Sequence, residues 1–232
     1  MLVIIQWKNS MLQIFSHIDT DLVNYPGRCC TTFFFSVCPM RCKYCYTLAK
    51  LQQKNYGMSE EEYEKILQRA ANNWIEAIAY TGGEPLACFD NLQYAIDKAE
   101  QYGMKYLKLD TNGAYPKELL QVLPRFSYIA MDVKTVIEDY PNLTGYQKKE
   151  NILESIEILK SCPIDHEYRI TVIEEYHTRE QLEEMAKLLD GQKVVLQRFR
   201  PEQSFAMRDY KETSSLYIEN IAKDIFPGAI CR

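Results

Sequence analysis

Residues 36–46 read Ser36-Val37-Cys38-Pro39-Met40-Arg41-Cys42-Lys43-Tyr44-Cys45-Tyr46 and follow directly after the apolar run Thr31-Thr32-Phe33-Phe34-Phe35. The three cysteines of this loop have the spacing C-x3-C-x2-C. Cysteine thiolates are the usual ligands of iron–sulfur clusters, and close spacing lets one loop wrap one cluster. A four-iron cluster needs four ligands, so three cysteines leave one iron open to another molecule. The aromatic rings of Tyr44 and Tyr46 could shield a cluster or pack on a bound ligand.

A structural zinc site is the main alternative for these cysteines. Such a site needs a fourth Cys or His ligand. Cys29, Cys30 or His17 could supply one, but none has a recognisable second-pair spacing. A disulfide is disfavoured because nothing marks the chain as secreted. The spacing therefore favours an iron–sulfur cluster over zinc.

Length and composition indicate one domain, 1–232, with a substantial core. The 27 Lys and Arg against 32 Asp and Glu give a net charge of −5, which argues against a nucleic-acid-binding surface. No apolar stretch is long enough to span a bilayer, so no membrane association is expected. The apolar start Met1–Ile5 has no basic segment before it and predicts no signal peptide. The eight cysteines then indicate metal ligands and buried thiols in the reducing cytoplasm.

Short apolar runs alternate with amphipathic segments along the chain. We expect strands at 31–35, 76–80, 105–109, 128–132, 168–173 and 194–199, and helices at about 59–73, 91–102, 117–122, 149–161, 178–189 and 214–225. This alternation predicts a parallel sheet with right-handed crossovers. Six units fall short of the eight that close a barrel, so the predicted fold is α/β with a partial (β/α)6 TIM-like barrel. Functional loops should lie at the carboxyl ends of its strands.

Two loops after these strands carry turn residues. In Thr81-Gly82-Gly83-Glu84-Pro85, the glycines let a backbone approach closely and expose N–H groups, although an ordinary turn between strand and helix has the same composition. Asp110-Thr111-Asn112-Gly113 ends the third strand, and an ordinary Asx turn is its alternative.

Charged residues follow or interrupt two further strands. Asp132 and Lys134 point to the same side of an extended strand, and a purely structural salt bridge between them remains the alternative to a binding role. Arg169 lies in an otherwise apolar strand and needs a counter-charge, from Glu167, another acidic core residue or a bound carboxylate. The nearby His177 is expected at the surface and is given no role.

The cysteine loop after the first strand and the glycine loop after the second together resemble the signature of the radical S-adenosylmethionine (radical SAM) enzymes, whose cores are partial barrels. The resemblance implies that Cys38, Cys42 and Cys45 hold a [4Fe–4S] cluster whose open iron is chelated by the amino and carboxylate groups of SAM. Reduction of the cluster then cleaves the sulfonium and yields a 5′-deoxyadenosyl radical. The aromatic Tyr44 is expected to bind the cofactor. The resemblance implies that these residues bind it as well: Gly82, Gly83, Glu84, Asp110, Asn112, Asp132, Lys134 and Arg169.

Within this superfamily the sequence is most similar to the activases of glycyl radical enzymes, of the anaerobic ribonucleotide reductase and pyruvate formate-lyase type. The similarity runs from about residue 14 to 201, with a short extension at 202–232. It is carried by the Asp-Thr-Asn-Gly loop, by Asp21–Arg28, by Ala130–Lys134 and by Gln197–Pro201. In the activases, the Asp and Thr matching Asp110 and Thr111 can also hold a monovalent cation.

Three departures from the activase pattern leave the protein substrate open. Asn24 stands where the activases usually carry an aspartate near the glycyl loop, Ser36-Val37 replaces Gln-Gly, and Tyr46 replaces a common histidine. The expected function is hydrogen abstraction from a glycine Cα of a partner enzyme, with flavodoxin or ferredoxin as electron donor. The alternatives are a radical SAM enzyme acting on a small molecule or nucleobase precursor, as a carboxydeazaguanine synthase does, and a non-enzymatic module without SAM affinity.

Overall fold

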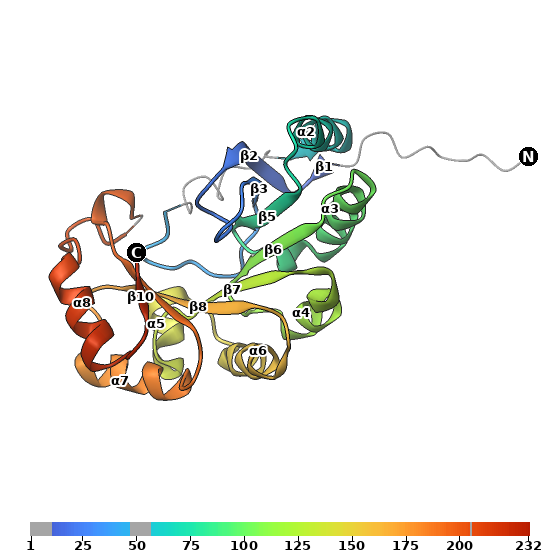
Figure 1. Cartoon of the computed structure of the whole chain (residues 1–232). Helices are drawn as coiled ribbons and strands as arrows, with labels where there is room; N and C mark the ends of the chain where they lie inside the picture. Colours follow the sequence, from blue (N-terminus) through green and yellow to red (C-terminus); the bar gives the residue numbers. More distant parts are fainter. Residues whose placement is uncertain (1–10, 47–56, 205) are drawn as a thin grey trace, which may run out of the picture.

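A computed structural model describes residues 11–46, 57–204 and 206–232 of the chain. Its centre is a curved sheet of eight strands in the order β10-β9-β8-β7-β6-β5-β3-β2 (Figure 1). The six expected strands are parallel neighbours in this sheet: β3 (Cys30–Phe35), β5 (Ala77–Gly82), β6 (Tyr106–Thr111), β7 (Tyr128–Asp132), β8 (His166–Val172) and β9 (Val194–Arg198). The predicted α/β fold is confirmed.

The sequence pattern does not predict the two strands at the sheet edges. β2 (Ile14–Asp21) runs antiparallel to β3, and β10 (Ile230–Cys231) runs parallel to β9. β2 buries its two ends and exposes much of its polar centre, so it lacks an apolar run, and β10 has two residues. Among the described residues β2 and β10 do not pair with each other, which leaves the curve of the sheet open. A separate two-stranded sheet joins β1 (Met11–Leu12) to β4 (Met58–Ser59).

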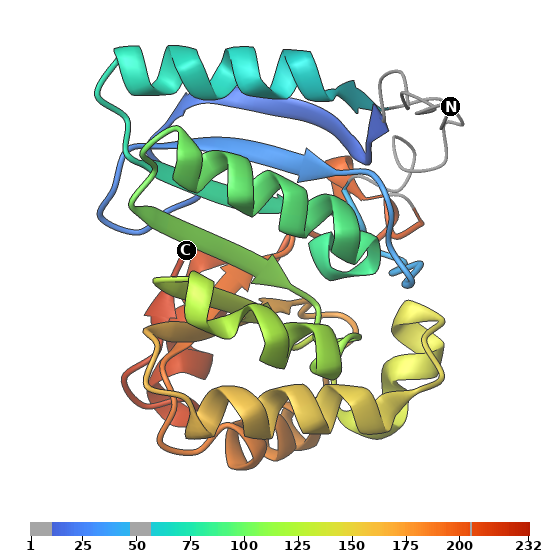
Figure 2. The ribbon, with the colours of Figure 1, turned by 90° about the vertical axis from the view of Figure 1, so that its right-hand side faces the viewer.

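Six helices correspond to the six that the sequence predicts: α2 (Glu60–Asn72), α3 (Phe89–Gln101), α4 (Pro116–Val122), α6 (Lys149–Ser161), α7 (Arg179–Leu188) and α8 (Ser215–Asp224). Figure 2 shows α2, α3, α4 and α6 across the outer face of the sheet. The hydroxyls of Ser59 and Thr178 cap α2 and α7, as their positions predicted. In the described part of the chain no helix is long and apolar enough to cross a lipid bilayer.

Several short turns of helix lie outside the prediction. They are α5 (Tyr140–Thr144) and the 3-10 segments η1 (Pro85–Cys88), η2 (Leu123–Arg125), η3 (Ile137–Asp139) and η4 (Pro201–Gln203). A single turn presents too few residues for an apolar periodicity to show in the sequence.

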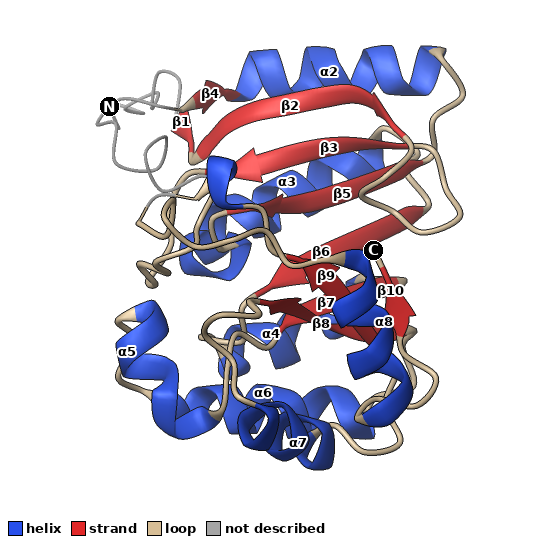
Figure 3. Ribbon diagram, turned by 90° about the vertical axis from the view of Figure 1, so that its left-hand side faces the viewer, coloured by secondary structure: helices blue, strands red, loops and turns tan. Residues whose placement is uncertain are grey.

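Figure 3 shows the inner face of the curved sheet, with helix α3 behind it. Alternation along each strand sends apolar side chains to the outer face, which the helices cover, and polar side chains to this inner face. On β6, Leu107 and Leu109 join the large apolar core, whereas Lys108 and Asp110 point to the opposite face. Alanines such as Ala79 on β5 occupy part of this inner face. The small side chains leave room inside the curve of the sheet, and the polar ones give that space its chemistry.

Candidate active site

The cysteine loop leaves the carboxyl end of β3 and borders a cavity inside the curve of the sheet. Cys38, Cys42 and Cys45 all line this cavity, whose volume is about 280 Å³. The cavity lies at the carboxyl ends of the parallel strands, where the fold predicted it.

Two other parts of the chain hold the cysteine loop in place. The Arg41 N–H donates to the Thr144 carbonyl at 2.7 Å, and the Lys43 N–H donates to the Leu143 carbonyl at 3.0 Å, both at the end of α5. On the other side, the Lys43 carbonyl accepts the Ala206 N–H at 2.9 Å. These backbone bonds fix the loop that carries the cysteines without using any of its side chains.

Most of the residues expected to bind the cofactor line the same cavity. They come from the cysteine loop and from the ends of β5, β6, β7 and β8: Tyr44, Gly82, Gly83, Asp110, Asn112, Asp132, Lys134 and Arg169. Asn24 and Gln197, from two further stretches that resemble the activases, also line it. Thr171 also lines the cavity, although the sequence did not lead us to expect it there. It lies two residues beyond Arg169 on β8, so strand alternation could have placed it on the same face.

Gly82 and Gly83 let the end of β5 lie directly on the cysteine loop. A Cβ atom at Gly83 would stand 2.3 Å from the Val37 carbonyl oxygen, and one at Gly82 would stand 2.6 Å from the Phe35 nitrogen. The two backbones bond at this contact: the Gly83 N–H donates to the Phe35 carbonyl at 2.8 Å, and the Glu84 N–H donates to the Val37 carbonyl at 2.7 Å. A side chain at either glycine would push the two loops apart.

Glu84 ties the glycine loop to the end of β6. Its fully buried carboxylate accepts hydrogen bonds from the Asn112 N–H at 2.6 Å, the Thr111 hydroxyl at 3.0 Å and the Leu86 N–H at 3.2 Å. Burial raises the pKa of Glu84 to about 7, although these hydrogen bonds oppose the increase. The resemblance led us to expect Glu84 among the residues that bind the cofactor. In the structure Glu84 does not line the cavity and instead braces the two loops that do.

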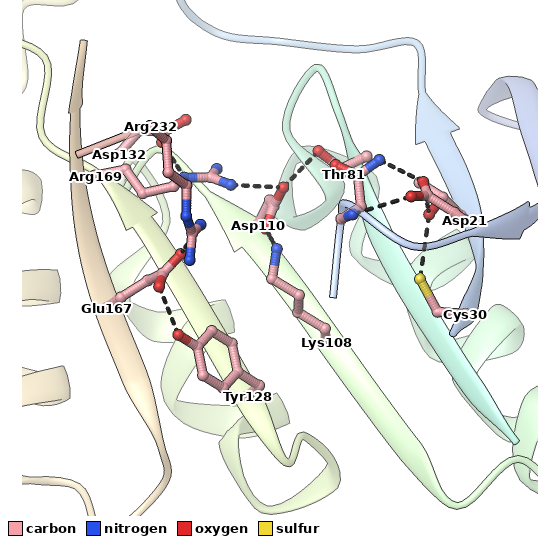
Figure 4. Close-up of polar contacts among 12 residues, drawn as sticks. Asp21, Cys30, Thr81, Lys108, Asp110, Tyr128, Asp132, Glu167, Arg169 and Arg232 are labelled. Atoms are coloured by element: carbon pink, nitrogen blue, oxygen red, sulfur yellow. Dashed lines mark hydrogen bonds and ion pairs between the residues drawn. The ribbon is translucent and has the colours of Figure 1, made fainter. Parts of the chain in front are cut away.

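An ion-pair network covers the inner face beneath the cavity (Figure 4). Arg169 bridges two carboxylates, because its Nε donates to Asp132 Oδ1 at 2.7 Å and its Nη1 donates to Asp110 Oδ2 at 3.1 Å. Lys134 Nζ donates to Asp132 Oδ2 at 2.9 Å, and Lys108 Nζ donates to Asp110 Oδ1 at 2.5 Å. The predicted pair of Asp132 and Lys134 is therefore present, and the counter-charges of Arg169 are these two aspartates.

The network carries one more positive than negative charge. Burial raises the pKa of Asp132, but the charges of Arg169 and Lys134 outweigh it, and the pKa falls below its ordinary value. The pKa of Asp110 is likewise lowered, because Arg169 and Lys108 outweigh its burial. Both carboxylates stay ionised at neutral pH, so three protein cations face two carboxylates. The surplus positive charge at Arg169 and Lys134 suits a bound carboxylate.

The prediction of a surface histidine is wrong for His177, which is buried. The Ile173 N–H donates to its Nδ1 at 3.1 Å, so Nε2 carries the proton and donates to the Lys134 carbonyl at 3.3 Å. Burial lowers the pKa of the His177 imidazole to about 4, which keeps the ring neutral at pH 7. His177 thereby holds the backbone of a residue that lines the cavity.

Comparison with known protein families accounts for this arrangement. The family model described as the Radical SAM superfamily matches residues 32–189. That range includes every residue of the cavity wall except Asn24 and Gln197. The chain belongs to the radical SAM superfamily. The resemblance that the cysteine and glycine loops indicated is confirmed.

Two curated relatives of this radical SAM protein differ in how much of it they match. A Methanocaldococcus jannaschii protein, whose name assigns it provisionally to the glycyl-radical enzyme activating enzymes, is 25% identical in an alignment 225 positions long. The alignment covers 88% of this chain and 92% of the relative. A GTP 3′,8-cyclase of Actinobacillus pleuropneumoniae is 26% identical over 126 residues, which cover 52% of this chain and 37% of the cyclase.

Solved structures share the fold. A domain of a pyruvate-formate lyase-activating enzyme from Bacteroides vulgatus superposes with a TM-score of 0.56 and 17% identity, over 66% of this chain and 97% of the other. Methylornithine synthase superposes with a TM-score of 0.62 and 17% identity, over 87% of this chain and 63% of the other. At these identities the likeness establishes the architecture alone.

The cysteine loop fits the [4Fe–4S] cluster that the superfamily implies. Burial raises the pKa of Cys38 to about 12 and that of Cys42 to about 11, so iron would have to displace their protons. Within residues 11–46, 57–204 and 206–232, no three His, Cys, Asp or Glu side chains are arranged to hold a single metal ion. The zinc site considered above would in addition need a fourth Cys or His ligand. Three thiols around one cavity match a cluster with one open iron.

The cavity also fits SAM. The hydroxyl of Tyr44 is buried in the cavity wall and has no hydrogen-bond partner among the described residues. A buried hydroxyl of this kind ordinarily has a partner, which a polar group of a bound molecule would supply. The surplus positive charge of Arg169 and Lys134 matches the carboxylate of SAM. Both groups point to a polar, partly anionic ligand beside the cysteines.

Proposed function

We propose that this radical SAM protein activates a glycyl radical enzyme by removing a hydrogen atom from a glycine Cα of that partner. The near-complete match with the M. jannaschii relative, over 88% of this chain and 92% of the relative, carries the proposal. This match covers more of the chain than residues 32–189, which the family model matches. The proposed site of action is the cytoplasm.

The roles proposed for individual residues follow from the cavity. Cys38, Cys42 and Cys45 would hold the cluster, and Arg169 and Lys134 would bind the carboxylate of SAM. With one electron from a flavodoxin or ferredoxin, the bound cluster and SAM would supply the radical that abstracts hydrogen. The protein's own part is to place these groups around one cavity at the carboxyl ends of the strands.

The segment after β2 supports a protein substrate. Asp21 Oδ1 accepts the N–H groups of Val23 at 2.7 Å and Asn24 at 3.0 Å, and Oδ2 accepts the Asn24 side-chain amide at 2.6 Å. These bonds set Asn24 in the cavity wall and leave the side chains of Leu22 and Val23 77% and 83% exposed beside it. Exposed apolar side chains next to a reaction cavity suit contact with a protein loop.

Isotope transfer tests the proposal. Pyruvate formate-lyase and anaerobic ribonucleotide reductase, each with glycine deuterated at Cα, are incubated with the reconstituted protein, SAM and reduced flavodoxin. We expect deuterium in 5′-deoxyadenosine and a glycyl radical signal in the electron paramagnetic resonance spectrum of one of the two enzymes. Unlabelled 5′-deoxyadenosine with both enzymes would contradict the proposal.

A small-molecule substrate is the second candidate, and the partial match to a GTP 3′,8-cyclase over 52% of this chain favours it. The same isotope experiment separates the two candidates when GTP deuterated on its ribose replaces the protein. Deuterium transferred from GTP, and none from glycine, would decide for the small molecule.

A further inference from the structure

The sequence led us to expect a monovalent cation beside Asp110, but protein groups already occupy both oxygens of this carboxylate. Oδ1 accepts a hydrogen bond from Lys108 Nζ at 2.5 Å. Oδ2 accepts one from the Thr81 hydroxyl at 2.8 Å and one from Arg169 Nη1 at 3.1 Å. Figure 4 shows these three donors converging on Asp110.

Thr111, the other residue expected to hold the cation, and the second carboxylate at the cavity are also engaged. The Thr111 hydroxyl donates to the Glu84 carboxylate at 3.0 Å and accepts the Gly113 N–H at 3.1 Å. Asp132, the second carboxylate at the cavity, holds Arg169 on one oxygen and a lysine on the other. The residues expected to bind a cation therefore do not fit one.

The buried side chain of Lys108 places a positive charge beside Asp110, where the sequence led us to expect a metal cation. Its side chain is 2% exposed, and it lies two residues before Asp110 on the inner face of β6. A buried ammonium is stable only beside a counter-charge, and Asp110 provides it. Because β6 is a central strand of the sheet, the ammonium is held in position by the fold itself.

We propose that this site binds SAM without a monovalent metal ion, because the Lys108 ammonium supplies the positive charge beside Asp110. The proposal rests on the SAM-dependent function of the chain but not on the identity of its substrate. A metal ion added to the network would raise its surplus from one positive charge to two, with no unoccupied carboxylate oxygen on Asp110 or Asp132 to receive it.

Binding of SAM to the anaerobically reconstituted protein tests the proposal. The dissociation constant of radiolabelled SAM is measured by equilibrium dialysis in potassium, sodium or choline chloride at equal ionic strength. We expect the three values to agree within about twofold. An affinity that falls at least fivefold in choline chloride, and returns when potassium is added, would overturn the proposal.

The variant Lys108→Met removes the charge and keeps most of the side-chain volume. We expect its affinity for SAM to fall at least tenfold in choline chloride and to recover at least fivefold in potassium chloride, since a potassium ion can take the place of the ammonium. Lys193→Met is the matched control, because Lys193 pairs with the buried Glu167 at 3.8 Å near the amino ends of the strands. The control should behave as the wild type. If Lys108→Met binds SAM as tightly as the wild type in all three salts, the Lys108 ammonium does not take the place of a metal ion.

A measurement on the wild type keeps the proposal testable if Lys108→Met does not fold. Crystals of the SAM complex are soaked in rubidium chloride, and the anomalous signal is examined beside Asp110. We expect no rubidium peak there, and a peak between Asp110 and the SAM carboxylate would refute the proposal. These readouts need no partner enzyme, so failure of the glycyl-radical assignment leaves them unchanged, whereas no SAM binding in any salt would overturn both.

Discussion

Gly83 sets the distance between the glycine loop and the cysteine loop. A methyl group at this position would lie 2.3 Å from the Val37 carbonyl oxygen, so Gly83→Ala must displace one backbone from the other. We expect the free energy of unfolding to fall by about 2 to 3 kcal/mol, which is typical of overpacking. Iron and sulfide bound per chain after reconstitution should fall by at least half.

Gly103→Ala is the matched control for this change. Gly103 has a φ of +84°, but no neighbouring atom lies within 4 Å of the place that an added methyl group would take, so its substitution should cost about 1 kcal/mol through backbone strain alone. It should leave the iron content unchanged. Equal iron content in the two variants would show that the contact with the cysteine loop does not matter for cluster binding.

His177 gives the protein a stability that depends on pH. Its folded-state pKa of about 4 lies below the ordinary value of 6.5, so between these values the unfolded chain binds a proton that the folded chain does not. Stability from this group is therefore complete above pH 6.5 and is lost as the pH falls towards 4, by up to about 3 kcal/mol. In His177→Gln this loss should disappear from urea denaturation curves recorded between pH 7 and 4.5. A wild-type slope in His177→Gln would refute the assignment.

At the scale of residues, the sequence predicted those site residues that are recognised by their spacing within one short loop. Cys38, Cys42, Cys45 and the two glycines belong to short loops, and the cavity contains all of them. The roles of Glu84 and His177 could not be predicted in the same way. They depend on burial and on partners 28 and 43 residues distant, which no local pattern reports.

At the scale of elements, the turn after β2 depends on one carboxylate. Asp21 accepts hydrogen bonds from Val23, Asn24 and the Thr32 hydroxyl, the last at 2.7 Å. Asp21→Ala should lower the free energy of unfolding by about 2 kcal/mol, since it leaves buried donors unpaired. It should also reduce hydrogen abstraction from a protein substrate, because Asn24 would leave the cavity wall. Both effects are measured by urea denaturation and by 5′-deoxyadenosine formation with the partner enzyme present.

Asp19→Ala provides the comparison on the same strand. Asp19 is exposed and pairs with Arg69 at 3.0 Å, so its loss should cost less than about 1 kcal/mol. Equal destabilisation by the two variants would contradict the bracing role of Asp21.

The elements that could be predicted are those with their own apolar pattern. The six parallel strands are buried runs and were expected within a few residues of their bounds. β2 and β10 were not, because an edge strand is defined by its partner more than by its composition. The sequence therefore predicted the central strands of the sheet but not its two edge strands. One of these, β2, ends at Asp21, which holds Asn24 in the cavity wall.

At the scale of the whole molecule, the cavity forms because one curved sheet gathers residues that lie far apart in the chain. Cys38, Gly83, Asp110, Asp132 and Arg169 reach one cavity from five neighbouring strands. The order of motifs along the chain predicted this meeting, since parallel strands present their carboxyl ends at one edge. The sequence could not predict the net charge of the ion-pair network in this cavity or the pairing of Lys108 with Asp110. Both depend on how the side chains pack in the folded chain.

The central claim is that this cavity initiates radical chemistry with SAM. The most direct measurement is the formation of 5′-deoxyadenosine by anaerobically reconstituted protein given dithionite and SAM. We expect formation by the wild type, none above background by Cys42→Ala, and wild-type formation by Cys162→Ala, whose thiol lies outside the cavity. Iron-loaded wild type that forms no 5′-deoxyadenosine, or Cys42→Ala that forms as much as the wild type, would contradict the account.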